Sequence, residues 1–236
     1  MFYLPRMQMA FGFGASDDLK WVKDALQSRL GLVGTISMRT PVGQLVKSSI
    51  SGRTRDEVSL RAYQRLVGTY RDWPDLAVAP VNEVEAVIGD VTYPDVKARY
   101  LGEALRLIAT RCADFDLAFL ARLSVVRALA WLEHLPGVGR KVSASTLNFS
   151  TLHMAAFVVD SHVLRILRRY GFVRAKADTR TAYDAVMEMS DGWSATDLAE
   201  LHILMKRLGQ TICRADHADC RHCPLTGRCR RVGCPR

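Results

Sequence analysis

Hydrophobic residues recur at intervals of three and four positions through most of this chain, which is the spacing of one face of an α-helix. In the segment 124–135, Val125, Leu129 and Leu132 follow this spacing. The one stretch that suggests a strand is Ala155–Val159, which is short enough to be extended coil instead. The pattern therefore predicts an all-α protein with about ten helices.

Several predicted helices begin at residues that commonly cap a helix N-terminus. Thr40 is followed by Pro41, and Thr54 is followed three residues later by Glu57, which is the spacing of a capping box. The other predicted helix starts are Ser16, Asn82, Pro94, Ser124, Thr179 and Ser194. No repeat or low-complexity linker interrupts these elements, so any division into domains is expected to be compact.

The N-terminal residues 1–16 are largely apolar and contain no acidic residue. They are not followed by a plausible cleavage site, so we interpret them as an apolar arm packed on the domain rather than a secretion signal. A transit peptide is the alternative interpretation. No run of about 18 apolar residues occurs, so the sequence predicts no membrane-spanning helix.

The chain is strongly basic, with 33 lysines and arginines against 24 acidic residues and a net charge of +9. Such a surplus favours a polyanionic partner, because neutralising phosphates releases condensed counterions. A high charge that serves solubility alone is the competing explanation. Arginines outnumber lysines by 26 to 7, so a lysine inside a glycine-rich turn is more informative than it would be elsewhere.

Four of the six cysteines form the pattern C-x6-C-x2-C-x5-C near the C-terminus: Cys213, Cys220, Cys223 and Cys229. A segment this short has little core of its own, and four thiolates so close in sequence can bind Zn²⁺ or an iron–sulfur cluster. Two disulfides are the structural alternative, which the absence of a secretion signal disfavours. Zinc ribbons usually contain two C-x2-4-C pairs separated by a longer segment. This chain has one C-x2-C pair, flanked by spacings of six and five residues, which favours an iron–sulfur cluster.

The remaining cysteines and the neighbouring arginines have separate interpretations. Cys234 lies outside the four-cysteine pattern, and Cys112 is predicted to be a buried small hydrophobic residue. Several arginines surround the pattern, where they could offset a negative cluster or face phosphate: Arg214, Arg221, Arg228, Arg230 and Arg231.

A glycine-rich turn with the sequence LPGVGRK, residues 135–141, joins two predicted helices. Backbone N–H groups at the start of the second helix would form an anion site, aided by the helix dipole. A plain helix–helix turn is the alternative. Lys141 lies in the first turn of the second helix, where the positive dipole end favours the neutral amine, and a neutral amine can form a Schiff base.

Asp160 follows an apolar run and immediately precedes a predicted helix. By itself it would be an N-cap that accepts from the backbone N–H of His162 or Val163. A cap also fixes the direction of the carboxylate, so both a structural and a chemical role are open when Asp160 is considered together with Lys141.

The sequence LPGVGRKV followed by VVDSHVLR resembles the helix–hairpin–helix–Gly/Pro–Asp signature of the DNA glycosylase superfamily. The four-cysteine tail resembles the iron–sulfur loop of the endonuclease III branch of that superfamily. The resemblance covers about residues 40–230, and the motifs occur in the family's order and spacing. Together they are far more specific than either motif alone.

The resemblance implies two helical domains with double-stranded DNA bound in a cleft between them. One is a six-helix barrel, residues 38–153, and the other is an iron–sulfur domain formed by 1–37 and 154–236. Lys141 and Asp160 correspond to the catalytic lysine and aspartate. The four patterned cysteines correspond to the ligands of a 4Fe–4S cluster. The DNA contacts expected on this basis are Gly137, Val138, Gly139, Arg140, Arg53, Arg55 and His162.

The implied function is that of a monomeric bifunctional DNA glycosylase and AP lyase in base excision repair. It would remove oxidised pyrimidines and act in the nucleoid of a bacterium, or in a nucleus or organelle otherwise. Damaged or abasic double-stranded DNA is the expected partner, and no membrane is involved.

One stretch departs from the family and puts the substrate in doubt. Where the branch has Ser-x-Gln-x-Thr-Asp, this chain has Ser51-Gly52-Arg53-Thr54-Arg55-Asp56. Arg53 replaces the glutamine that fills the gap left by a flipped nucleotide, and Ser161 replaces a threonine. Removal of thymine or uracil from mismatches, removal of a modified cytosine, or binding of abasic DNA with little catalysis therefore remain alternatives, as does a zinc-stabilised scaffold protein. The adenine-removing branch is disfavoured because it usually lacks the lysine.

Overall fold

The computed structural model describes residues 12–234, and all the regular secondary structure in this part of the chain is helical. Extended pairing among these residues is limited to two isolated bridges, Arg39 with Ser150 and Cys213 with Ala218. The α-helices are α1 Gly12–Leu30, α2 Pro41–Ile50, α3 Asp56–Thr69, α4 Trp73–Val78, α5 Val81–Val87, α6 Pro94–Arg111, α7 Val125–Glu133, α8 Arg140–Asn148, α9 Ser161–Tyr170, α10 Thr179–Met189 and α11 Ala195–Thr211. The prediction of an all-α protein is confirmed.

Five of the predicted helix starts are confirmed. Thr179 is the first residue of α10, and Ser194, just before α11, accepts from the Asp197 N–H. The Thr40 side chain accepts a hydrogen bond from the Gly43 N–H at 3.2 Å and so caps α2. Ser124 caps α7 by accepting from the Arg127 N–H, and Pro94 is the first residue of α6. Each start follows from a side-chain acceptor or a fixed proline φ at the position where the helix needs it.

Three other predicted caps are wrong. Helix α3 begins at Asp56 without a side-chain cap, because the Thr54 hydroxyl accepts from the Lys97 ammonium and the Thr92 N–H instead. Asn82 lies inside the first turn of α5, which begins one residue earlier. Ser16 lies within α1, and most of the predicted N-terminal arm falls outside the described residues.

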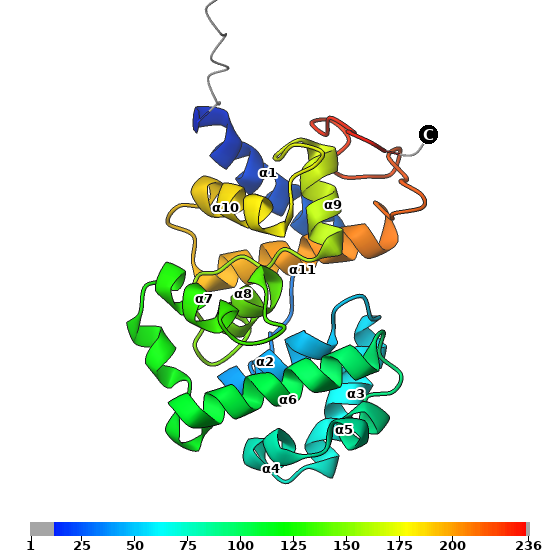
Figure 1. Ribbon diagram of the computed structural model, residues 1–236. Coiled ribbons are helices and arrows are strands. Elements are labelled where there is room, and N and C mark those ends of the chain that lie inside the picture. The colour runs from blue at the N-terminus through cyan, green and yellow to red at the C-terminus, as the bar shows by residue number, and fades with distance from the viewer. Residues whose placement is uncertain (1–11, 235–236) are drawn as a thin grey trace, which may run out of the picture. The chain divides into compact units, whose positions relative to one another are not determined.

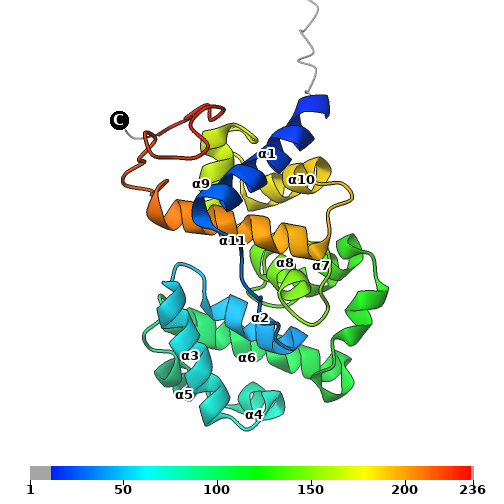
Figure 2. The ribbon, with the colours of Figure 1, turned by 180° about the vertical axis from the view of Figure 1, so that it is seen from behind.

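The chain divides into two compact units. One comprises the chain up to Val33, Ser161–Gly192 and Ile203 onward, and the other comprises Gly34–Asp160 and Trp193–His202. In the second unit α6 packs against α2, α4 and α5, and α8 packs against α2 and α7. Figures 1 and 2 show α6 beside α2 from opposite sides. In the first unit α10 contacts α1 and α9.

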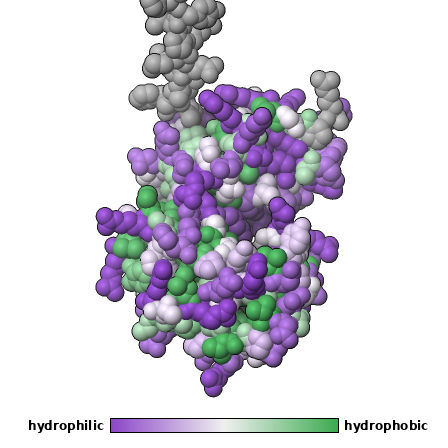
Figure 3. All heavy atoms as spheres, in the orientation of Figure 1, coloured by the Kyte–Doolittle hydropathy of each residue, from purple (hydrophilic) through white to green (hydrophobic). Residues whose placement is uncertain are grey.

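Each unit has its own apolar core. In α1, Leu19, Val22 and Leu26 are fully buried, which matches the spacing of one helical face. In the second unit Leu45 and Ile50 of α2 are fully buried as well. Hydrophobic residues on the visible surface form separate patches among hydrophilic ones (Figure 3). No helix in residues 12–234 combines the length and hydrophobicity that crossing a bilayer requires.

Candidate functional site

The turn before α8 is shaped by a glycine at a position where any side chain would be strained. Gly137 has a φ of 73°, and a Cβ at this position would lie 2.7 Å from the Cβ of Tyr100 on α6. The Val138 side chain is buried, and its N–H donates to the Leu135 carbonyl at 3.1 Å. The central residues of the turn therefore pack closely against the rest of the second unit, with Gly137 beside Tyr100 of α6.

Gly139 differs from Gly137, because its backbone is extended and a Cβ there would meet nothing within 4 Å. It is the N-cap of α8 and supplies no side-chain acceptor for the first N–H groups of that helix. The N–H groups of Val142 and Ser143 donate to the Gly139 carbonyl at 3.0 Å each, and the N–H groups before them point out of the start of the helix. The turn thus presents backbone donors beside an open surface, which is the arrangement that an anion needs.

Lys141 lies in the first turn of α8 and is partly exposed. Its Nζ is 3.4 Å from the carbonyl oxygen of Ser48 on α2. This long contact holds the amine near α2 and leaves it accessible. The prediction that Lys141 stands in the first helical turn after the glycine-rich segment is confirmed.

A buried polar network fixes the face of α8 that carries Lys141. The Gln44 amide donates to the Ser48 and Ser145 hydroxyls at 3.0 Å each, and the two hydroxyls are 2.9 Å apart. All three side chains are buried, and Ser145 lies one helical turn after Lys141. Because buried polar groups must keep their partners, this network sets the register of α8 against α2 and thereby the position of the lysine.

The Arg140 side chain makes its contacts within the protein. Its guanidinium forms an ion pair with Glu133 of α7, and both side chains are largely buried. The Ser143 hydroxyl lies 3.3 Å from the same carboxylate. The pair joins α7 to α8 on either side of the turn.

Asp160 ends a buried segment, Ala156 to Val159, that has no regular secondary structure. The segment is anchored by the Met154 N–H, which donates to the Leu147 carbonyl at 2.9 Å, and by His202, whose ring Nδ1 is 2.8 Å from the Val158 carbonyl. Asp160 itself is partly exposed and immediately precedes α9.

Lys141 and Asp160 belong to the same compact unit, whereas His162 belongs to the other. The Leu147 contact ties α8 directly to the segment that ends in Asp160. His162 is partly exposed, with its Nδ1 3.2 Å from Arg165 Nη2. The lysine and the aspartate are therefore carried by two neighbouring pieces of one unit.

The loop of residues 51–55 is a tight turn that exposes Arg53 and Arg55. Arg53 has a φ of 55°, and its carbonyl accepts from the Thr92 hydroxyl at 2.9 Å. Arg55 precedes α3 without capping it through its side chain. The backbone at Arg53 is thus in a conformation that non-glycine residues rarely adopt.

Lys97 of α6 holds this loop from inside. Its ammonium donates to the carbonyls of Ile50 and Gly52 at 2.8 and 2.7 Å, and to the Thr54 hydroxyl at 2.9 Å. Burial lowers the pKa of Lys97 to about 8, so the group remains mostly protonated at pH 7. Its three donors match three acceptors, which fixes the loop that presents Arg53.

Replacing Lys97 with methionine is expected to lower the free energy of unfolding by about 1–3 kcal/mol, because loop acceptors lose their donor. Backbone amides of residues 52–54 should also exchange hydrogen faster, since the loop is no longer tied to α6. Thermal unfolding and hydrogen exchange measure these effects. Arg53→Ala is the matched control, because it removes an exposed side chain and should leave stability nearly unchanged. Equal destabilisation by both changes would contradict the positioning role of Lys97.

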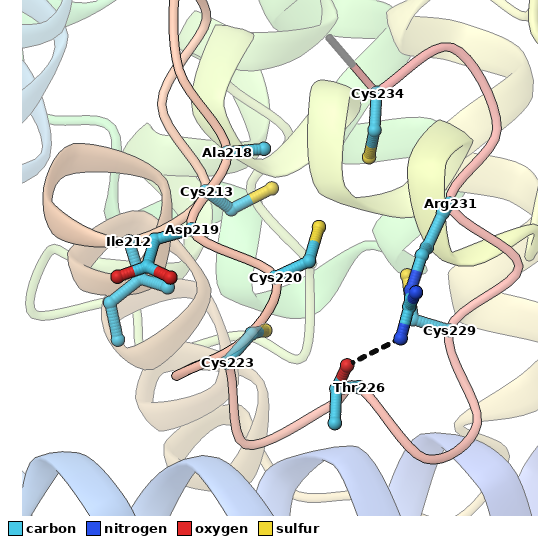
Figure 4. A pocket seen from close by; sticks show the side chains of 10 residues that line it. All are labelled: Ile212, Cys213, Ala218, Asp219, Cys220, Cys223, Thr226, Cys229, Arg231 and Cys234. Carbon is cyan, nitrogen blue, oxygen red and sulfur yellow. Dashed lines mark hydrogen bonds between the residues drawn. The ribbon is translucent and has the colours of Figure 1, made fainter. Parts of the chain in front are cut away.

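The four patterned cysteines and Cys234 line one hollow at the C-terminal loop (Figure 4). The loop starts after α11, and the Leu225 side chain is buried beneath it. Burial raises the pKa of Cys223 to about 11 and also raises that of Cys229. A metal bound here must therefore displace protons from the thiols.

Within residues 12–234, no three Cys, His, Asp or Glu side chains are grouped so that they could hold one metal ion. A single tetrahedral zinc would bring its sulfurs to about 3.8 Å from one another, because Zn–S bonds are about 2.3 Å long. A four-iron cluster binds four thiolates on separate irons and needs them further apart. Four thiols that line one hollow provide the sulfur donors that either group requires.

The cation that reaches these thiols most directly is Arg169, which is only 6% exposed. Its Nη1 is 3.3 Å from Cys213 Sγ and donates to the Arg214 carbonyl at 2.6 Å. Nη2 donates to the Ala215 carbonyl at 3.3 Å. Arg169 thus pins the start of the cysteine loop to α9 and places positive charge beside a thiol.

The predicted arginine rim is exposed: Arg214, Arg221, Arg228, Arg230 and Arg231. Two of these charges have acidic partners. Arg214 pairs with Asp216 at 2.8 Å, and Arg228 pairs with Asp18 at 2.9 Å while lying 4.6 Å from the centre of the Trp21 ring.

Sequence reasoning missed Arg169, Lys97 and the network of Gln44, Ser48 and Ser145. A signal existed for Arg169, because it lies three positions after Ile166 on the apolar face of α9. The sequence signal for Lys97 was weaker, because it consists only of the scarcity of lysines, of which the chain has seven. The network carried none, since small polar residues in a helix are more often exposed.

Comparison with known proteins gives these residues a family context. A model of the HhH-GPD superfamily of base excision DNA repair proteins matches residues 46–190. Endonuclease III of Thermotoga maritima is 28% identical over 191 residues, which cover 80% of this chain and 82% of that protein. The family match includes the glycine turn, Lys141 and Asp160 and ends before the cysteine loop.

Two solved structures share the fold. A trapped endonuclease III–DNA covalent intermediate matches with a TM-score of 0.75 and 23% identity, over 92% of this chain and 96% of that one. A thermostable thymine-DNA glycosylase matches with a TM-score of 0.71 and 16% identity, over 91% of this chain and 94% of that one.

Proposed function

Because the chain belongs to the HhH-GPD superfamily of base excision DNA repair proteins and is similar to endonuclease III, we propose that it is a bifunctional DNA glycosylase and AP lyase. Its substrate is double-stranded DNA with a damaged base, of which oxidised pyrimidines are the first candidates. The observation that carries the proposal is the placement of Lys141. It follows the Gly137 turn directly, remains accessible, and lies in the same unit as Asp160.

The backbone of the DNA binds at the turn before α8. The N-terminus of this helix, which has no side-chain cap, meets a phosphate through its backbone and its dipole, and the open surface beside Gly139 allows that approach. Arg140 contributes its backbone rather than its side chain, since the guanidinium is paired with Glu133. Val138 anchors the turn from beneath.

Catalysis begins with a nucleotide flipped out of the duplex. The neutral amine of Lys141 donates its lone pair to C1′ while the bond between C1′ and the base breaks, and the base leaves with that electron pair and takes up a proton. Asp160 stabilises the cationic character that develops at the sugar, or accepts the proton that Lys141 must lose. The nitrogen, now bonded to C1′, loses a proton and its lone pair forms the C=N bond as the C1′–O4′ bond breaks and O4′ takes up a proton. The resulting imine permits loss of a C2′ proton, and the electrons of that C–H bond expel the 3′ phosphate by β-elimination.

Cys213, Cys220, Cys223 and Cys229 fit the donor set of a 4Fe–4S cluster, which would give the loop a rigid core when bound. Arg169 supports this assignment, because a buried guanidinium beside Cys213 offsets part of the charge of a thiolate. The exposed arginines of the loop then face the DNA backbone. The functional division into a barrel domain, residues 38–153, and a cluster domain formed by 1–37 and 154–236 is part of this proposal.

A second candidate substrate rests on Arg53, which is exposed on a tight turn where the family has glutamine. A guanidinium can pair bidentately with guanine, so recognition of an orphan guanine would favour removal of mismatched thymine or uracil, or of a modified cytosine. Arg55 and His162 remain proposed DNA contacts. The protein acts wherever the cell keeps its DNA.

The test is a base-release assay with thymine glycol, dihydrouracil, uracil, thymine and abasic sites, each placed opposite all four bases. We expect release of the oxidised pyrimidines and cleavage at abasic sites. Preference for thymine or uracil opposite guanine would establish the second candidate instead. Salt-dependent binding without release of any base would reject the catalytic proposal in favour of a binding protein.

A further inference from the structure

The hollow in the C-terminal loop has five thiols, one more than a four-iron cluster requires. The fifth belongs to Cys234, which lies five residues beyond the last patterned cysteine. In Figure 4 its sulfur points into the hollow, toward the side occupied by Cys213 and Cys220. The family pattern does not account for this thiol.

Local structure explains how Cys234 reaches the hollow. Residues 231–234 form a turn in which the Cys234 N–H donates to the Arg231 carbonyl at 3.2 Å, and Gly233 has a φ of 62°. The Val232 N–H donates to the Arg169 carbonyl at 3.0 Å. The segment that carries Cys234 is thus fastened to the C-terminal end of α9, where Arg169 also approaches Cys213.

Of the four patterned cysteines, Cys220 is the one that Cys234 approaches most directly. In Figure 4 the Cys234 sulfur points toward the sulfurs of Cys220 and Cys213, and burial together with the charge of Cys220 raises the pKa of the Cys234 thiol. Cys223 lies across the hollow from Cys234 in Figure 4. Within this hollow, Cys220 is therefore the ligand position that Cys234 can reach with the least rearrangement.

We propose that Cys234 is a reserve ligand of the cluster site that binds iron when Cys220 does not. This inference rests on the proposed 4Fe–4S cluster. The exchange needs no oxidant, because the Cys234 thiol releases its proton to solvent and its sulfur forms the iron–sulfur bond that the Cys220 sulfur would otherwise form. The site would then survive the loss of Cys220 but not the loss of Cys223.

The test uses anaerobically purified full-length wild type and the variants Cys234→Ser, Cys220→Ser, Cys223→Ser and Cys220→Ser/Cys234→Ser. Iron, acid-labile sulfide and absorbance at about 400 nm report the cluster independently of enzymatic activity. We expect wild type and Cys234→Ser to be fully loaded, and Cys220→Ser to retain half or more. The double variant and Cys223→Ser should lose iron by about tenfold.

A second measurement covers the case in which a variant folds poorly. Brief alkylation followed by mass spectrometry should label Cys234 in loaded wild type and find it protected in Cys220→Ser. Equal loss of iron from Cys220→Ser and the double variant would overturn the proposal, as would loss from Cys234→Ser alone or full retention in the double variant. If wild-type protein purified in this way contained no iron, the proposal of a 4Fe–4S cluster would itself be rejected.

Discussion

Replacing Lys141 with glutamine is expected to abolish the protein–DNA adduct that borohydride traps, and to reduce strand cleavage at abasic sites by about 10³-fold or more. The reason is chemical, because an amide nitrogen has no basic lone pair with which to form an imine. The fold should be unaffected, since the lysine is partly exposed and its contact with the Ser48 carbonyl is a long 3.4 Å. Trapping gels and single-turnover cleavage measure the effect, and the thermal midpoint checks the fold.

The matched control for this experiment is Lys20→Gln. Lys20 is an exposed lysine of α1 in the other unit, where it pairs with Asp24 at 2.7 Å. Abasic DNA reacts slowly with any accessible amine. The control therefore measures how much trapping is lost when an ordinary surface lysine is removed. A trapped adduct of wild-type intensity in Lys141→Gln would show that another amine is the nucleophile.

Sequence alone predicted those features that depend on a few consecutive residues. The helical periodicity, the Thr40–Pro41 start and the turn with Gly137 are local, and the structure confirms each of them. Thr54 shows where such reasoning fails. Its hydroxyl could cap α3, but the Lys97 ammonium, 43 residues away in sequence, takes it instead. A pattern within one segment carries no information about a competing partner from another.

The same limit explains the parts of the candidate site that the sequence did not predict. Ser145 is one of several small polar residues in α8, and only its packing against Gln44 makes it a determinant of where Lys141 lies. Arg169 and Cys234 meet the cysteine loop through hydrogen bonds at the end of α9. Their roles depend on tertiary contacts, whereas the four patterned cysteines could be recognised from their spacing alone.

Replacing Asp160 with asparagine is expected to slow base release by about 10²–10³-fold, because the neutral amide cannot stabilise positive charge at the sugar or accept a proton from Lys141. This substitution separates catalysis from structure. Asparagine is as good an N-cap as aspartate, so a residue that only starts α9 would tolerate it with unchanged activity. Single-turnover base release at saturating enzyme measures the chemical step, and the thermal midpoint should stay near that of wild type.

Asp160→Ala completes the comparison, because it removes both the charge and any cap at the start of α9. We expect it to match asparagine in lost activity and to lower the free energy of unfolding by a further ~1 kcal/mol, the usual contribution of a cap. If asparagine retained wild-type rates while alanine lost both activity and stability, Asp160 would act by holding the start of α9. The chemical half of the lysine–aspartate proposal would then have to be assigned to another acid.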